Sequence, residues 1–373
     1  MVTSLLDTDM YKWTMLYYLY GTPFRNMKTN FSLMNRGSEN ILKYVDIHEL
    51  RQELDATKRL VLCGNEIEYI QKILFEHIVD VDESFFDFIT EYSLPDYIMY
   101  EDNGELNLSF EGPWTKVSLW ETIAMSTICE LYYKNIGFDG SDSLQKGISK
   151  INKLQANKVP LDTIIEYGTR RRASKAIQHD IMWAMAGELK TSNLLLAKEL
   201  DITPMDTMAH EIFMGIEAAT RDQANENNIV SAILSDWKDI FKESLHIALI
   251  DTYTTEAYLE SIKLEPAILC DYRGMRQDSG DPEAIADMYI AFLKEYNVDP
   301  KDKVVLFSDA LDEDKIADLY HKYKNVTNPK FGWGTDFTCD IDVPNLNIVV
   351  KMTECNGVST KKISDSPGKT MGV

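Results

Sequence analysis

The chain of 373 residues lacks the features of a secreted, disulfide-bonded or membrane-spanning protein. Its five cysteines are scattered, odd in number and without a Cys-x-x-Cys pair, which argues for a reducing compartment and against a zinc or disulfide framework. No apolar run approaches the roughly 20 residues that cross a bilayer, and the acidic residues at 7 and 9 are unlike a signal peptide. We therefore expect a soluble protein that resides in the cytoplasm.

Positive charge is scarce, because 38 Lys and Arg against 60 Asp and Glu give a formal net charge of -22. A chain this acidic has no general attraction for nucleic acid or for an anionic membrane surface. Any phosphate must therefore be held by local arginine clusters, and a small ligand is the natural partner. Hydrophobic residues make up 45% of the chain, and its length predicts two domains, or one large barrel with an added domain.

Two common catalytic motifs are also absent. His210 is followed by Glu211, but Met214 stands four positions after it, so the two-histidine helix of metalloproteases is excluded. Ser-Pro-Gly-Lys-Thr at 366–370 resembles the end of a P-loop, yet Ile363 stands where the first glycine is required, so we expect no Walker-type site. Taken alone, His210 fits either an ordinary polar histidine or a catalytic one.

The first third of the chain reads as an α+β domain. A helix after the acidic cap at 7–9 is apolar on too many sides for a monomer surface, so it belongs either to the core or to an interface. Strands are expected at 30–34 and 106–110, and helical periodicity runs through much of 42–95. A further apolar helix is expected at 119–133.

After about residue 160, short apolar segments alternate with polar clusters and helical patterns. The apolar segments that we expect to be strands preceding such clusters are 164–165, 247–250, 267–270 and 304–307. A strand, a polar loop and a helix in repetition are typical of a β/α barrel, whose active site forms at the carboxyl ends of its strands. We therefore assign 1–118 to an N-terminal α+β domain, completed by 345–373, and 119–344 to a barrel catalytic domain.

Polar chemistry is densest at 273–282, Arg-Gly-Met-Arg-Gln-Asp-Ser-Gly-Asp-Pro. Arginine binds phosphate or carboxylate bidentately, carboxylates hold Mg²⁺ or ribose hydroxyls, and the turn at Ser279 and Gly280 lets a polyanion approach the backbone. The segment 168–172, Gly-Thr-Arg-Arg-Arg, likewise places three cations after an apolar segment. Each segment alone is compatible with a solvated turn or with anion capture.

Eight motifs, in the same order and spanning nearly the whole chain, resemble those of the nicotinate phosphoribosyltransferase family. They lie at 6–12, 168–172, 207–211, 251–253, 276–281, 307–311, 331–335 and 363–369. The resemblance implies a type II phosphoribosyltransferase fold, an α/β fold with an irregular β/α barrel and an N-terminal α+β domain, in a homodimer with sites shared between subunits. It also implies that nicotinate and phosphoribosyl pyrophosphate give nicotinate mononucleotide and pyrophosphate, with ATP hydrolysis coupled in, as the first step of salvage to NAD.

The resemblance also implies roles for single residues. His210 matches the histidine that the family phosphorylates with ATP, while Asp278 and Asp309 are candidates for ribose hydroxyls and Mg²⁺, with Asp251 on the same polar floor. The substrate-binding residues implied are Tyr11, Tyr167, Arg170, Asn193, Arg276, Ser279, Gly280, Gly332, Gly334 and Thr335.

Among these residues, the tyrosines and arginines address the substrates directly. Tyr11 of one subunit and Tyr167 of the other would sandwich the pyridine ring, and Arg170 and Arg276 would hold the nicotinate carboxylate or the pyrophosphate. The glycines at 332 and 334 would offer backbone amides to the 5′-phosphate.

The choice of nicotinate over nicotinamide rests on Asn193, because the related nicotinamide enzyme has an acid there that would repel a carboxylate. The chain departs from the family at Lys190 and Asp206, where glycine is usual, and at Ile212, where tryptophan is usual. Nicotinamide or quinolinate as substrate, and a non-enzymatic nucleotide-sensing relative, are the alternatives.

Overall fold

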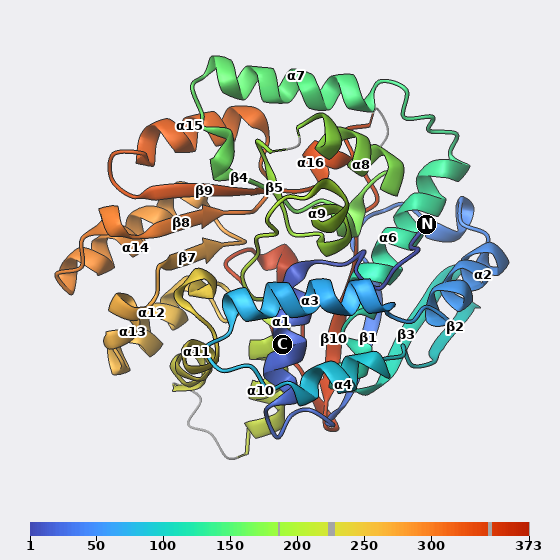
Figure 1. The fold of residues 1–373 in the computed structure, drawn as a ribbon, viewed down its shortest axis with the longest axis horizontal. Coiled ribbons are helices and arrows are strands. Elements are labelled where there is room, and N and C mark those ends of the chain that lie inside the picture. The colour runs from blue at the N-terminus through green and yellow to red at the C-terminus, as the bar shows by residue number, and fades with distance from the viewer. Residues whose placement is uncertain (186, 223–227, 342–344, 373) are drawn as a thin grey trace.

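The computed structural model describes residues 1–185, 187–222, 228–341 and 345–372. They form two sheets surrounded by helices (Figure 1). The helices are α1 (Met10–Tyr20), α2 (Ile47–Lys58), α3 (Gly64–His77), α4 (Ser84–Thr90), α5 (Trp114–Val117), α6 (Trp120–Asn135), α7 (Ser143–Ala156), α8 (Lys175–Ala184), α9 (Leu194–Leu200), α10 (His210–Thr220), α11 (Ile229–Ile240), α12 (Thr255–Leu264), α13 (Ala267–Asp271), α14 (Pro282–Glu295), α15 (Glu313–Tyr323) and α16 (Thr335–Thr338). No helix in these ranges combines the length and the apolar character needed to span a membrane.

The first sheet has six parallel strands in the order β5-β4-β9-β8-β7-β6. These strands are β4 (Ile164–Glu166), β5 (Lys190–Thr191), β6 (Ile247–Leu249), β7 (Gly274–Gln277), β8 (Val304–Phe307) and β9 (Asn328–Trp333). Because Glu166 is in register with Trp333 and Gln277 with Phe307, the strands end together at one edge. All residues of β4, β6, β7 and β8 are buried, as expected for a parallel sheet covered on both faces.

Irregular backbone that follows β5 along the chain lies against the ends of the parallel strands. Met205 donates its N–H to the Thr191 carbonyl at 2.9 Å, and Arg276 on β7 reaches Thr207 Oγ1 at 3.2 Å and the Met208 carbonyl at 3.4 Å. The predicted α/β fold is confirmed, with a barrel that is irregular at this point.

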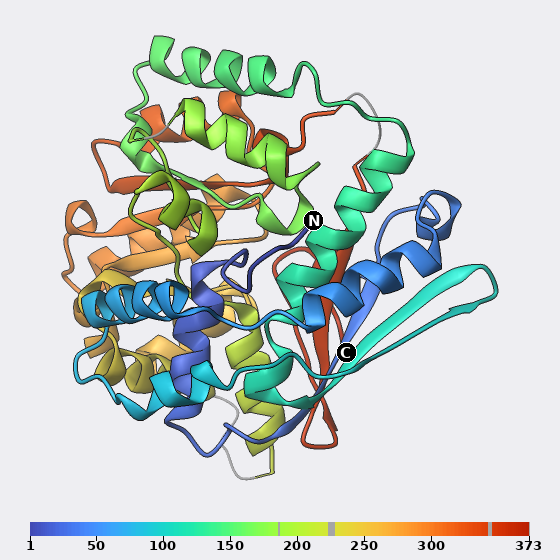
Figure 2. The ribbon, with the colours of Figure 1, turned by 45° about the vertical axis from the view of Figure 1, so that its right-hand side comes forward.

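The second sheet is antiparallel, in the order β11-β10-β1-β3-β2. Its strands are β1 (Lys28–Asn35), β2 (Tyr97–Asp102), β3 (Glu105–Pro113), β10 (Ile348–Cys355) and β11 (Val358–Ser359). The β2–β3 hairpin extends away from the body of the molecule (Figure 2). Because β10 pairs with β1, the C-terminal segment shares the sheet of the N-terminal segment, while the expected domain boundaries remain a prediction.

Helix α1 crosses the middle of the molecule (Figure 1). Every side chain from Met10 to Leu19 is buried, and aromatic contacts join Trp13 to Tyr92 and Tyr18 to Trp237. The sequence left open whether this helix lies in the core or at an interface. Other parts of the same chain bury it, so it is a core helix.

One predicted strand is wrong. The apolar run at 267–270 forms helix α13, which begins after Pro266, and the strand lies a few residues later at β7. Gly274 opens β7 in close contact with β8, since a Cβ there would lie 1.9 Å from the Val304 carbonyl oxygen. The error arose because a short apolar run does not distinguish a buried strand from a buried helical turn. Arg276 therefore projects from within a strand, where the sheet fixes its backbone.

Candidate active site

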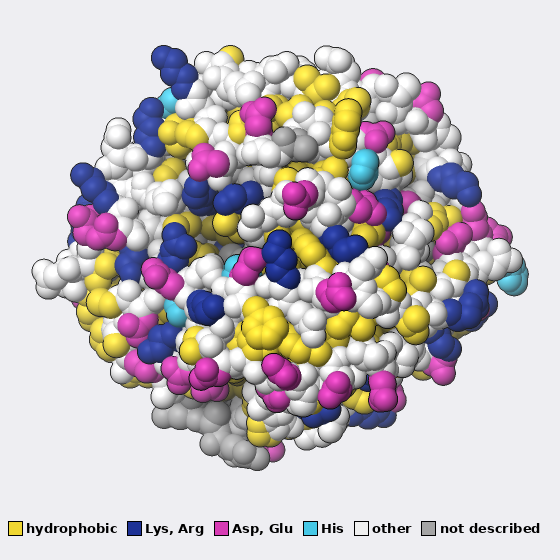
Figure 3. Space-filling model, in the orientation of Figure 1, with side chains coloured by type: hydrophobic (Ala, Val, Ile, Leu, Met, Phe, Trp, Pro, Cys, Tyr) yellow, Lys and Arg dark blue, Asp and Glu magenta, His cyan; other side chains and the backbone are white. Residues whose placement is uncertain are grey.

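A cavity of about 960 Å³ lies at the carboxyl ends of the parallel strands. The predicted site residues that line it are Tyr167, Arg170, His210, Arg276, Asp278, Asp309, Gly332, Gly334 and Thr335. Acidic and basic side chains are interspersed on the face shown in Figure 3, with several Lys and Arg near its middle. Local cation clusters thus exist despite the net negative charge.

The arginine run at 170–172 divides into three roles. Arg172 is buried and donates to both Asp7 oxygens, at 2.6 and 2.8 Å, and to Glu130 at 2.9 Å, so it links the N-terminal segment to the barrel. Arg171 donates to the Ile348 carbonyl at 3.1 and 3.0 Å. Arg170 and Arg171 both line the cavity, and Arg170 faces the carboxylates of Asp9 and Glu121 there. The run is therefore neither a solvated face nor a uniform anion clamp.

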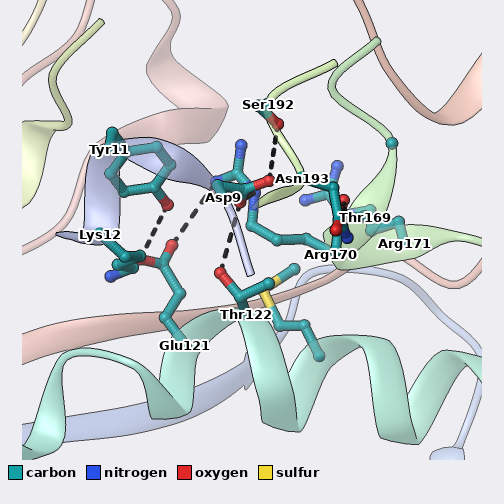
Figure 4. A network of polar contacts seen from close by, with 12 residues as sticks. Asp9, Tyr11, Lys12, Glu121, Thr122, Thr169, Arg170, Arg171, Ser192 and Asn193 are labelled. Atoms are coloured by element: carbon teal, nitrogen blue, oxygen red, sulfur yellow. Dashed lines mark hydrogen bonds and ion pairs between the residues drawn. The ribbon is translucent and has the colours of Figure 1, made fainter. Parts of the chain in front are cut away.

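Arg170 takes part in the polar network of Figure 4. Its nearest carboxylates are Asp9 at 3.5 Å and Glu121 at 3.6 Å, and the Tyr11 hydroxyl donates to Glu121 at 3.4 Å. Burial acts to raise the pKa of Glu121, but Lys12 and the neighbouring cations hold it well below its usual value. Glu121 is thus a fixed negative charge beside Arg170.

Arg276 is the most enclosed cation of the predicted substrate residues. Its Nε donates to Ser308 at 2.9 Å, Nη2 lies 3.4 Å from Asp278, and the guanidinium carbon lies 5.3 Å from the centre of the Tyr167 ring. The Tyr167 ring can occupy this place because Gly332 has no side chain, as a Cβ there would come within 2.4 Å of the ring. A flat anionic ring would meet both an aromatic face and a guanidinium here.

His210 is the first residue of α10, and both ring nitrogens have neighbours. Nδ1 lies 3.0 Å from Thr252 Oγ1, while Nε2 faces Asp278 at 3.1 Å and Lys362 at 2.8 Å. Burial, with the Lys362 charge, lowers the pKa of His210 to about 4, and burial lowers the pKa of Lys362 to about 8. At neutral pH the imidazole is therefore uncharged and has a nucleophilic lone pair.

Two lysines of the C-terminal tail belong to the site although we did not predict them. Lys362 contacts His210, and Lys369 lies 2.6 Å from Asp309 and also donates to the Asp278 carbonyl. The segment 366–370, noted for its partial likeness to a P-loop, held the signal for Lys369. For Lys362, no local pattern pointed to the site.

Ser279 and Gly280 hold this tail and lie outside the described cavity lining. The Ser279 hydroxyl donates to Asp251 and accepts the N–H of Asp365 at 3.1 Å, while Gly280 N–H donates to Ser366 Oγ at 3.0 Å. Both residues thus shape the site through the tail, and their expected contact with the substrate stays a prediction.

Asn193 also lies outside the described lining. Its carbonyl oxygen caps α9 by accepting the Leu196 N–H at 2.9 Å, and its amide donates to Asp7 at 2.8 Å and Thr169 at 3.1 Å. Internal partners thus engage both ends of the amide, and the expected role of Asn193 in binding the substrate stays a prediction.

Three potential ligand atoms for a cation, from His210, Asp251 and Asp278, lie within 4.8 Å of one another. One Asp251 oxygen is buried and finds no hydrogen-bond partner within the residues that the structure describes. Asp309, expected to join Asp278 in holding Mg²⁺, instead accepts from Lys369.

Tyr11 and Tyr167 both lie beside Asp206 within one chain. The Tyr11 N–H donates to Asp206 at 3.4 Å, and Asp206 acts on the pKa of Tyr167, which burial raises well above its usual value. A single chain does not test the expected pairing of one tyrosine from each subunit, which stays a prediction.

Arginines, lysines and carboxylates around an aromatic face, at the ends of parallel strands, define an enzyme that handles a phosphorylated ligand together with a small anionic ring. Comparisons with known proteins make this class specific. Residues 6–129 match the model of the nicotinate phosphoribosyltransferase N-terminal domain, and residues 163–372 match the model of the nicotinate phosphoribosyltransferase family. The chain belongs to this family.

Relatives agree over the full length. Nicotinate phosphoribosyltransferase of Edwardsiella ictaluri is 34% identical over 384 residues, and that of Salmonella typhimurium 35% over 383, each covering 99% of this chain and 92% of the relative. The crystal structure of nicotinate phosphoribosyltransferase from Porphyromonas gingivalis superposes with a TM-score of 0.89 at 28% identity, covering 100% of this chain and 97% of the other.

Proposed function

We propose that the chain transfers the phosphoribosyl group of phosphoribosyl pyrophosphate to nicotinate, giving nicotinate mononucleotide and pyrophosphate. The observation that carries the proposal is the joint placement of Tyr167, Arg276 and His210 on one cavity in a member of this family. The pyridine nitrogen forms a bond to C1 of the ribose, and the bond from C1 to the pyrophosphate oxygen breaks. This displacement needs charge neutralisation and positioning more than a strong acid or base.

Nicotinate binds at the Tyr167 end of the cavity. Tyr167 supplies an aromatic face, and Arg276 and Arg170 supply cations for the carboxylate. Arg276 is fixed by Ser308 and by its place in β7, so it needs little rearrangement when the substrate arrives. Preorganised donors of this kind favour the developing charge of the reaction.

The phosphates of phosphoribosyl pyrophosphate lie toward Lys362 and Lys369. Both lysines line the cavity, as do Gly334 and Thr335 at the start of the short helix α16. We place the leaving pyrophosphate at the lysines, because two ammonium groups beside each other compensate its charge.

Mg²⁺ fits beside Asp251 and Asp278, because carboxylate oxygens are its preferred ligands and one Asp251 oxygen has no hydrogen-bond partner in the described part of the chain. When bound, Mg²⁺ would neutralise phosphate charge on the substrate. Asp251 and Asp278 keep their own positions through Ser279 and Ser308.

ATP is the proposed co-substrate, with His210 as the phosphoryl acceptor. The neutral imidazole attacks the γ-phosphorus through Nε2, which faces the cavity residues Asp278 and Lys362, and the bond to ADP breaks. Nδ1 keeps its proton and donates a hydrogen bond to Thr252 Oγ1. Lys362 then faces the phosphoryl oxygens and couples the histidine to the pyrophosphate position.

The homodimer remains a prediction, and we propose, as the family resemblance implies, that its sites are shared between subunits, beside the contacts that one chain already makes. Asp206, Tyr11, Tyr167 and Arg170 all interact within one chain. Mixing Tyr11→Ala with His210→Ala chains tests this point. A divided site would restore activity in the mixture, whereas a site contained in one chain leaves the mixture inactive.

Pyrophosphate release with each pyridine tests the whole proposal. We expect turnover with nicotinate and none with nicotinamide or quinolinate, in the presence of phosphoribosyl pyrophosphate and Mg²⁺. Equal turnover of nicotinate and nicotinamide would contradict the substrate assignment. Pyrophosphate release with no pyridine would favour the nucleotide-sensing alternative or simple hydrolysis.

A further inference from the structure

Asp206 lies where the residues that we assign to nicotinate meet. Its side chain is buried, and it accepts the backbone N–H groups of Thr207 at 2.8 Å and of Tyr11 at 3.4 Å. The ionisable side chains that face it from the surrounding elements are Asp9, Tyr11, Tyr167, Arg170 and Arg276. Asp206 itself lies outside the described cavity lining, so any charge on it acts on the nicotinate end through Tyr167, Arg170 and Arg276, which do line the cavity.

Neither nearby arginine forms an ion pair with Asp206. Arg276 pairs with Asp278 at 3.4 Å, and Arg170 pairs with Asp9 at 3.5 Å. Within the described part of the chain, no lysine or arginine nitrogen lies within 4.0 Å of the Asp206 carboxylate. A buried carboxylate without a cation is unfavourable in its charged form. Accordingly, burial and the neighbouring Asp9 raise the pKa of Asp206 to about 7.

We infer that Asp206 sets the affinity of the site for nicotinate, which binds when the Asp206 carboxyl has taken up one proton from solvent. The inference rests on the proposed function, because the substrate's own carboxylate must share the two arginines. With Asp206 charged, a further carboxylate would enter beside an uncompensated one. The proton removes that repulsion and gives Asp206 an O–H donor. In this step the carboxylate gains one O–H bond with a proton from solvent, and no other bond of the protein forms or breaks.

The test is the pH dependence of kcat/KM for nicotinate, between pH 6 and 9 at saturating phosphoribosyl pyrophosphate. If only the protonated form binds, the wild-type value falls about tenfold per pH unit above the pKa. Asp206→Asn keeps the size and removes the charge. The kcat/KM of this variant for nicotinate should therefore exceed the wild-type value about tenfold at pH 8 and match it within about twofold at pH 6.

Two measurements separate this effect from other ionisations. The pH profile of kcat/KM for phosphoribosyl pyrophosphate, at saturating nicotinate, should be the same in Asp206→Asn and wild type, because Lys362 and Lys369 are unchanged. Asp236→Asn on α11 removes another carboxyl with a raised pKa outside the cavity lining, and it should keep the wild-type profile for nicotinate.

A wild-type kcat/KM for nicotinate that stays level from pH 7 to 9 would overturn the inference without any variant. The inference would also be overturned if a folded Asp206→Asn protein showed the wild-type decline of kcat/KM with pH, or if it lost activity at every pH. Should Asp206→Asn not fold, Asp206→Ser tests the same loss of charge. Failure of the wild-type chain to use nicotinate at any pH would instead refute the proposed function, and the inference with it.

Discussion

Two buried clusters of charged side chains meet at the first turn of α10, where His210 and Glu211 are neighbours. Around Glu211 every charge is compensated, since Oε1 accepts from Trp114 and Ser118, each at 2.7 Å, and Oε2 accepts from Lys12 at 2.5 Å. Around His210, compensation is incomplete. The difference lies between neighbouring residues of one helix.

The His210 cluster leaves charge and bonding capacity unused. Lys362 and Asp278 approach the same nitrogen, Nε2, and one Asp251 oxygen has no hydrogen-bond partner among the described residues. A fully bonded cluster holds elements together, whereas an incompletely bonded one retains the capacity to bind a charged ligand. The cluster around Lys12 and Glu211 therefore holds α1, α5, α6 and α10 together, whereas the cluster around His210 can bind a charged ligand.

Replacing His210 with Gln should have the largest effect, because it removes the proposed phosphoryl acceptor completely. Label from γ-labelled ATP should fall from about one per chain to none, and stimulation of transfer by ATP should vanish. His246→Gln, which changes a buried histidine outside the cavity, is the matched control and should retain label. Label that persists in His210→Gln would assign the phosphoryl group to another residue.

Replacing Lys12 with Met should lower the stability of the fold more than it lowers the activity of the enzyme. Loss of the cation leaves Glu121 and Glu211 buried without their shared partner, and we expect the free energy of unfolding to fall by about 3–5 kcal/mol. Urea denaturation measures it. Lys28→Met breaks an exposed pair with Glu111 and should change the free energy of unfolding far less than Lys12→Met does. Equal effects of the two variants would contradict the distinction.

Replacing Arg276 with Lys should lower the activity, because Arg276 pairs with Asp278 of the incompletely compensated cluster around His210. A lysine keeps the charge but loses the planar fork, so kcat/KM for nicotinate should fall about 10- to 100-fold. Arg51→Lys changes an arginine that binds the Met99 carbonyl at the β2–β3 hairpin, and it should retain activity. An Arg276→Lys enzyme with normal kinetics would remove the carboxylate assignment.

Replacing Asp7 with Asn should have a smaller, pH-dependent effect on stability. Burial acts to raise the pKa of Asp7, but Arg172 lowers it below the ordinary value of 3.8. Its stabilising contribution is thus fully present above pH 3.8 and is lost as pH falls through the lowered pKa. The difference between wild type and Asp7→Asn, about 1–3 kcal/mol at pH 7, should shrink toward pH 3 in denaturation curves. A constant difference would show that Asp7 acts by shape alone.

Local sequence was sufficient for much of the site. Polar residues that directly follow buried strands, such as Asp309 after β8 and Tyr167 after β4, reach the cavity because parallel strands end at one edge. Asn193 and Ser279 fulfil the same local pattern yet are engaged by internal partners. Sequence proximity to the site therefore did not tell a residue that lines the cavity from one that holds its wall.

The sequence by itself determined the strand and helix alternation, the net charge and the motif order, because these follow from local periodicity and composition. Only the tertiary structure decided that Arg172 is spent on Asp7, that Lys362 reaches His210 and that Asp206 lies between Tyr11 and Tyr167. Each of these contacts joins residues far apart in the chain, and each depends on burial, which changes the charge that a side chain carries.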